Sequence, residues 1–150
     1  MYEETLEKVI PVEKKIWIVR GVSGVHAHIK DMLTRTSNYV ILVVPTLDRV
    51  PVDRIAALKG MVRVQIAADF RPSSSSHVRI LNQLKARRGV LVRKYTGGNL
   101  MGIVVDGREA LLAVIPKEHK EVLGVATVDE DWILVIQGFL NYIWTVSEHL

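Results

Sequence analysis

The sequence predicts an α/β fold in which a central mixed sheet, made of parallel βαβ units and an antiparallel hairpin, carries helices on both faces. Three observations lead to this prediction. Apolar, strand-like segments alternate with amphipathic segments between residues 15 and 88. An Asp106-Gly107 pair then separates two apolar runs, as in a tight hairpin. The chain ends in a long apolar helical segment at residues 129–150.

The first half of the chain predicts three strands, each followed by a helix. The strands are residues 15–21 (KIWIVRG), 39–45 (YVILVVP) and 62–68, where β-branched and other apolar side chains dominate. After the first strand, apolar residues recur at helical spacing and predict a helix that faces the sheet; they are Val22, Val25, Ile29, Met32 and Leu33. This βαβα order favours parallel strand pairing.

Two shorter helices complete this half. Pro51 is well placed as the first residue of a helix that continues to Leu58, with Gly60 as its stop signal. Four serines after Pro72 predict the N-cap of the next helix. Its apolar side is expected to consist of Val78, Leu81 and Leu84.

The second half predicts antiparallel strands and a final helix. Residues 90–115 are interpreted as strand, Gly97-Gly98 turn, strand, Asp106-Gly107 hairpin and strand, and residues 122–128 as one more strand. Three acidic residues open the terminal segment, where a helix N-terminus favours negative charge. Its apolar residues cover more than one face, so it lies in the core or in a dimer interface; they are Trp132, Ile136, Phe139, Leu140, Ile143 and Trp144.

The composition limits the classes of protein to consider. The chain has 150 residues, 49% of them hydrophobic and 24% charged, which fits one domain at residues 15–150 preceded by a linker or helix end at residues 1–14. The N-terminus lacks a signal peptide, and no apolar run is long enough to span a membrane, so a cytoplasmic protein without membrane contact is expected. The absence of cysteine excludes disulfides and thiol catalysis. Few amide side chains, four Asn and three Gln, favour a thermophilic source.

Asn99, Met101 and Asp106 have the spacing of an H-x-K-x4-D motif that is followed by glycine. The spacing resembles one half of the phospholipase D superfamily, in which the His acts as nucleophile or acid/base and the Lys holds phosphate. Here an amide stands at the nucleophile position, and an amide neither attacks phosphorus nor transfers protons near neutral pH. A thioether stands at the position of the cation. The resemblance therefore implies a degenerate site and no enzymatic activity.

Further segments resemble the C-terminal, phospholipase D-like effector domain of archaeal TrmB-type transcriptional regulators. They are WIVRG followed by a helix, NYVILVVP, MGIVVDGREALLAV and the closing GFLNYIW. The resemblance implies a homodimer and a small, sugar-like effector. Members of that family place a winged-helix domain before this one, and the chain contains no such pattern. We therefore expect DNA contact only through a domain outside this chain, which is either a truncated or a free-standing effector domain.

Two groups of residues are candidates for binding. Asn99 and Asp106, with Arg93 and Tyr95 on the preceding strand, are the best polar residues for an effector pocket. Positive charge also concentrates at the end of one helix and in the next strand, where it forms a basic patch of Arg79, Lys85, Arg87, Arg88 and Lys94. No cofactor and no metal are expected, because His26 and His28 point in different directions on a helix and the other histidines are scattered.

These residues leave three functions open. The first is a non-catalytic domain that senses an effector and dimerises within a transcriptional regulator. The second is a structural or adaptor domain that binds a nucleic acid or a protein through the basic patch or the terminal helix. The third, an active phosphodiesterase or nuclease, is disfavoured because Asn99 and Met101 replace the nucleophile and the cation.

Overall fold

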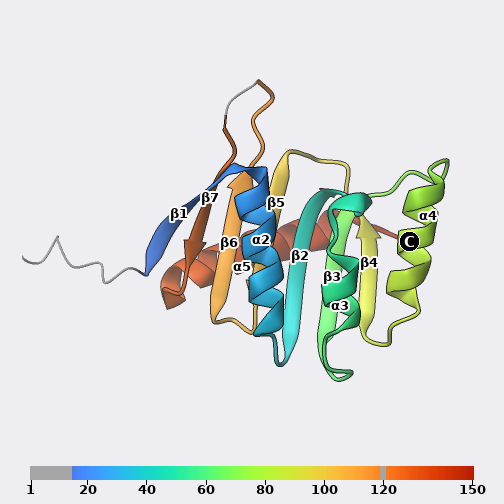
Figure 1. Ribbon diagram of the computed structural model, residues 1–150, viewed down its shortest axis with the longest axis horizontal. Coiled ribbons are helices and arrows are strands. Elements are labelled where there is room, and N and C mark those ends of the chain that lie inside the picture. Colours follow the sequence, from blue (N-terminus) through green and yellow to red (C-terminus); the bar gives the residue numbers. More distant parts are fainter. Residues whose placement is uncertain (1–14, 119–120) are drawn as a thin grey trace, which may run out of the picture.

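The computed structural model describes residues 15–118 and 121–150, and these residues form one eight-stranded sheet with helices on both faces (Figure 1). The strand order is β1-β7-β6-β5-β2-β3-β4-β8. The strands are β1 (Ile16–Arg20), β2 (Tyr39–Thr46), β3 (Arg63–Asp69), β4 (Val90–Lys94), β5 (Leu100–Val105), β6 (Glu109–Val114), β7 (Leu123–Thr127) and β8 (Glu148–His149). The predicted linker at residues 1–14 lies outside the described residues.

The mixed sheet is confirmed, but its parallel part is smaller than the sequence predicts. Only β2, β3 and β4 pair in parallel. The first strand does not join them, because β1 pairs antiparallel with β7 at the opposite edge of the sheet. The hairpin strands β5 and β6 pair in the expected register around Asp106-Gly107, where both residues have positive φ. Antiparallel pairing of β5 with β2 joins the hairpin to the parallel strands.

One face of the sheet is covered by α2 (Gly21–Thr34), α3 (Val52–Ala56) and α4 (Ser75–Lys85), and a short 3-10 helix, η1 (Leu47–Arg49), follows β2 on this side. The apolar face predicted for the first helix is confirmed, since Val25, Ile29, Met32 and Leu33 are all buried. Because alternate residues of a strand face opposite sides, Met101 and Ile103 of β5 complete this core from the sheet.

The predicted start of α4 is confirmed, but one residue of its predicted buried face is wrong. Ser74 caps the helix by accepting a hydrogen bond from the His77 backbone amide at 3.3 Å. Val78 is 39% exposed, whereas His77 and Ile80 are buried in its place. His77 accepts a hydrogen bond from the Arg71 amide and pairs with the Asp48 carboxylate, so the burial of its imidazole is compensated.

The other face is crossed by α5 (Glu130–Val146), which packs mainly on β2, β5 and β6 (Figure 1). This helix is shorter than the segment 129–150 predicted from the sequence, because Ser147 leaves the helix and Glu148–His149 pair with β4. It is also amphipathic: Ile133, Ile136, Leu140 and Ile143 are buried, while Trp132 and Phe139 are exposed. No helix within the described residues is long and apolar enough to cross a membrane.

Candidate functional site

The residues of the degenerate motif lie along β5, and the strand separates them. Asn99 is exposed and immediately precedes the strand, Met101 lies within it, and Asp106 follows its last residue. Seven residues of extended chain span roughly 23 Å. Asn99 and Asp106 therefore lie at opposite ends of the sheet and do not line one pocket.

Met101 is fully buried in the core beneath α2. A lysine at this place would bring an ammonium group into an apolar environment, where an unpaired charge is strongly destabilising. The second residue of the motif spacing is therefore part of the hydrophobic core in this chain.

Asp106 holds the loop that leads into β2. Its carboxylate accepts hydrogen bonds from the backbone amides of Ser37 at 2.8 Å, Asn38 at 2.7 Å and Tyr39 at 3.0 Å. Burial raises the pKa of this carboxyl, but the three amide donors outweigh that effect and hold the pKa below its usual value. The geometry is that of a structural turn residue.

The other two residues of the predicted pocket lie at the opposite end of the molecule from Asp106. Arg93, in β4, packs its guanidinium 4.3 Å from the ring centre of Trp144 and donates a hydrogen bond to the Trp144 carbonyl. Tyr95 follows β4 and packs beside the α5 core. Arg93 thus connects β4 to the end of α5, a role that its sequence position does not reveal.

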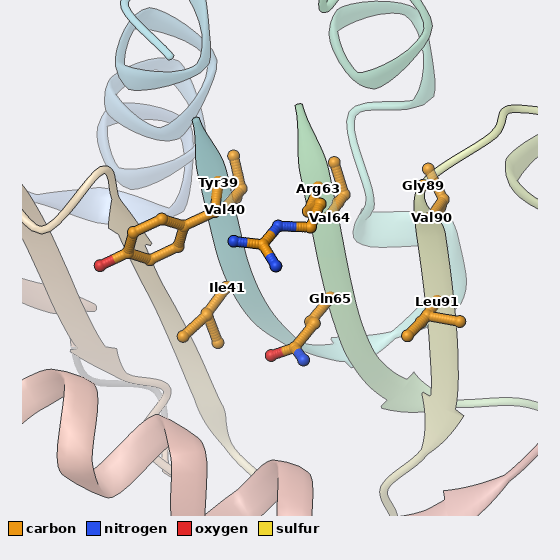
Figure 2. A pocket seen from close by; sticks show the side chains of 9 residues that line it. All are labelled: Tyr39, Val40, Ile41, Arg63, Val64, Gln65, Gly89, Val90 and Leu91. Atoms are coloured by element: carbon orange, nitrogen blue, oxygen red, sulfur yellow. The ribbon is translucent and has the colours of Figure 1, made fainter. Parts of the chain in front are cut away.

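A groove that the sequence did not predict lies on the α5 face of the sheet (Figure 2). Its volume is about 560 Å³, within the range of small-molecule sites. Two rows of residues line it across β2, β3 and the start of β4. One row is Tyr39, Arg63 and Gly89, and the other is Ile41, Gln65 and Leu91. It is open because α5 covers only part of this face.

The groove combines an apolar floor with an unpaired cation. The exposed Leu91 supplies apolar surface, Ile41 is largely covered by α5, and no acidic residue lines the groove. The Arg63 side chain extends toward Tyr39 and Ile41 (Figure 2) and forms no hydrogen bond or ion pair with any described residue. The Tyr39 hydroxyl donates to Gln137 of α5 at 3.0 Å, which links the groove to that helix. The arrangement suits an anion with a flat apolar body.

Five exposed apolar residues follow a 3-4-3-4 spacing along α5: Trp132, Val135, Phe139, Tyr142 and Val146. We call this set the α5 seam. Each side chain is between 44% and 64% exposed. The spacing is that of the a and d positions of helices that pair. The first four seam residues each lie one position before a buried residue, about 100° around the helix, so the seam flanks the stripe that packs on the sheet.

The members of the predicted basic patch differ in their contacts. Arg87 donates hydrogen bonds to the carbonyls of Leu58, Lys59 and Val62, which fixes the turn before β3. Its role is structural. The remaining members, Arg79, Lys85, Arg88 and Lys94, form no hydrogen bond or ion pair within the described residues, and Arg79 lies among cations of other helices.

The described histidines lie in α2, α4 and β8. No group of three or more metal-ligating side chains occurs within residues 15–118 and 121–150. His28 packs its ring edge-on against Trp17, and His26 lies on a different side of α2. His119, which the sequence places in a loop, is outside the described residues.

No protein-family model and no curated protein sequence matches this chain. Several solved structures share its fold. TrmBL2, described as an archaeal chromatin protein with a novel mode of DNA binding, is similar with a TM-score of 0.69 and 17% identity over 99% of this chain. The chain spans 61% of the length of that protein.

Two further solved structures are also similar. Nuc of Salmonella typhimurium, a phospholipase D family member, has a TM-score of 0.66 at 12% identity, covering 90% of this chain and 97% of Nuc. NucT of Helicobacter pylori has a TM-score of 0.63 at 13% identity, covering 91% of this chain and 99% of NucT. Identities this low establish the fold alone. The chain has a phospholipase D-like fold, which it shares with TrmBL2.

Proposed function

We propose that this chain is a non-catalytic domain that dimerises and senses an effector within a transcriptional regulator. The observation that carries the proposal is the α5 seam, a continuous apolar stripe on the outer side of a helix. A helix that is exposed to water on one side normally carries polar residues there. Five exposed apolar side chains at the spacing of paired helices therefore indicate a surface that another protein covers.

A second copy of the chain fits the seam best. Its five side chains are between 44% and 64% exposed, and a twofold axis would bring the same apolar stripe of two copies together.

The absence of catalysis in this proposal rests on the two motif positions that carry chemistry in the superfamily. Asn99 offers neither a nucleophile nor a general base, and the buried thioether of Met101 offers no charge to a phosphate. No other side chain supplies a cation at that point of β5, because the strand alternates and the next residue on the same face is Ile103. These features support a binding role for the domain.

The effector in this proposal occupies the groove beside α5. A carboxylate would pair with the Arg63 guanidinium, and an apolar body would rest on Leu91 and beside the Tyr39 ring. Because the groove and the α5 seam lie on the same face of the sheet, a bound molecule would alter how a second subunit packs there. Such a change in dimer geometry would be relayed to a DNA-binding module supplied elsewhere.

Analytical ultracentrifugation tests the proposal. We expect the wild-type chain to sediment as a dimer and Phe139→Glu to sediment as a monomer, because a carboxylate in the middle of the seam would be buried without a partner. Met61→Glu is the matched control: Met61 is 92% exposed and lies outside the seam, so this variant stays dimeric. A monomeric wild type, or a dimer that persists in Phe139→Glu, contradicts the proposal.

The adaptor function is the second candidate, and the unpaired cations Lys85 and Arg88 favour it. It predicts binding of duplex DNA that weakens steeply with salt, as expected when cations displace counterions. Loss of that binding in a Lys85→Gln, Arg88→Gln double variant, without any change in oligomeric state, would favour the adaptor over the effector domain.

A further inference from the structure

A cleft of about 540 Å³ opens between three helices on the side of the sheet opposite α5. Helices α2, α3 and α4 contribute its walls, and the loop before α3 contributes its floor. The polar and charged residues that line it are His26, Lys30, Asp53, Arg54, Arg79 and Gln83. They are separated by up to 57 positions in the sequence, so only the fold brings them together.

The cleft has an excess of positive charge. Lys30, Arg54 and Arg79 come from three different helices, and Asp53 is the one acidic residue in the lining. None of these three cations forms an ion pair or hydrogen bond with a described residue. Lys30 is half-buried, whereas Arg54 and Arg79 are exposed, and Arg54 lies near enough to Asp31 of α2 to lower the pKa of that carboxyl. An anion bound between the cations of this cleft would reduce their mutual repulsion.

His26 provides a second and independent observation. Its Nδ1 atom is buried and has no hydrogen-bond partner among the described residues. Buried polar atoms are nearly always paired with protein, water or ligand. Burial lowers the pKa of this imidazole, and the positive charges of Lys30 and Arg49 lower it further. His26 and Lys30 also line a neighbouring cavity of about 430 Å³, which extends the cleft toward Arg49 and Ser23.

We propose that this cleft binds the phosphate group of a small phosphorylated molecule, with Lys30, Arg54 and Arg79 as its ligands. Guanidinium groups match the oxygen geometry of phosphate, and lysine adds a compact charge. Asp53 and Gln83 are placed to hydrogen-bond hydroxyl groups on the remainder of the molecule. The site is on the opposite side of the sheet from the groove and the α5 seam, so it does not depend on the function proposed above.

A compact ligand fits this cleft better than a nucleic acid backbone does. The cations come from three helices around an open cleft and do not follow one helix face. A polyanion laid across the cleft would bring its phosphates near Asp53 as well as the cations, which costs electrostatic energy. A single phosphate bound between the cations brings no further negative charge past that carboxylate.

Isothermal titration calorimetry at low salt tests the site, with glycerol 3-phosphate, inorganic phosphate and glycerol as probes. We expect both phosphates to bind and glycerol to show no detectable binding. Arg79→Gln and Lys30→Gln should each weaken glycerol 3-phosphate binding at least tenfold, the effect of losing one charge-assisted contact. Arg88→Gln, an exposed arginine outside the cleft, is the matched control and should change the affinity less than twofold.

Nuclear magnetic resonance of the His26 ring gives a second measurement. Glycerol 3-phosphate should raise the pKa of His26, because the bound anion offsets the positive field of the neighbouring cations. The charged residues that line the two cavities around it are Lys30, Arg49, Arg54, Arg79, Asp48 and Asp53. Absence of phosphate binding, an equal loss in Arg88→Gln, or short duplex DNA that binds tighter than either phosphate and is lost in Arg79→Gln would each overturn the proposal. Sedimentation of the same samples reports the dimer separately.

Discussion

Leu140 lies directly over Gly102, so closely that a Cβ on the glycine would stand 2.7 Å from the Leu140 Cδ2 atom. Gly102 is in β5 and Leu140 is fully buried in α5. The absent side chain lets the helix pack against the centre of the sheet, and the helix then covers Val104 and Ile41. The depth of α5, and with it the position of the α5 seam and the groove, depends on this contact.

We therefore expect Gly102→Ala to destabilise the protein by about 1–3 kcal/mol, the usual cost of adding volume to a packed core. Chemical denaturation followed by circular dichroism measures this difference. Gly138→Ala is the matched control, because a Cβ there meets nothing within 4 Å. It should stabilise the fold by about 1 kcal/mol through helix propensity. Equal destabilisation by both variants would show that Gly102 has no special packing role.

Met101→Lys should destabilise the protein by more than about 3 kcal/mol, because Met101 is fully buried and an ammonium group there has no partner. Met101→Leu keeps the volume and should cost less than about 1.5 kcal/mol. Denaturant titration of the two variants compares them directly. The difference between their free energies of unfolding tests whether residue 101 belongs to the core. A Met101→Lys variant as stable as Met101→Leu would show that it does not.

Asp106→Asn should cost about 1–3 kcal/mol at neutral pH, since an amide cannot accept all three hydrogen bonds from residues 37–39. The pKa of Asp106 is lowered in the fold, so its ionised form stabilises the protein above the usual value of 3.8, and this contribution is lost as the pH falls through the lower, folded value.

The difference in stability between wild type and Asp106→Asn should therefore be full near pH 7 and shrink below about pH 4. Thermal unfolding across this range measures it. Asp53→Asn, at an exposed carboxylate without a hydrogen bond to a described residue, is the control and should show little difference at any pH. A constant difference for Asp106→Asn from pH 7 to pH 3 would contradict the assignment of the anchoring role to the charged form.

Arg63→Gln should leave the fold intact, because Arg63 is exposed and pairs with no described residue, but it should weaken binding of an aromatic carboxylate at least tenfold. Indole-3-acetate is the probe, and indole-3-acetamide, which has the same shape without the charge, is its control ligand. Calorimetry with the wild type, Arg63→Gln and Arg88→Gln separates the groove from general surface charge. Equal binding of acid and amide would contradict the role assigned to Arg63.

Local sequence patterns were sufficient to predict most elements. Runs of β-branched and other apolar residues mark β2 and β3, the Asp106-Gly107 pair marks the β5–β6 hairpin, and the serines after Pro72 mark the start of α4. These signals act over a few residues and do not depend on distant partners. The order of the same elements also led to the phospholipase D-like fold that the solved structures share.

The same local patterns failed where distant residues decide the outcome. The pairing of β1 with β7 cannot be deduced from β1, because its own residues fit any half-exposed edge. His77 is buried instead of Val78, since Asp48 and the Arg71 amide, which lie elsewhere in the chain, satisfy its ring nitrogens. The residues of the predicted pocket do not line one cavity, because Asn99 and Asp106 lie at the two ends of β5.

Local signals in the sequence predicted strands β1 to β7, the hairpin, the start of α4 and the spread of apolar residues over more than one face of α5, because each depends on neighbouring residues. Tertiary packing decided which apolar stripe of α5 meets the sheet, that a groove remains beside it, and that Lys30, Arg54 and Arg79 line one cleft. Cavities and charge clusters arise from surfaces of separate elements, and their positions are set when those elements pack around the core.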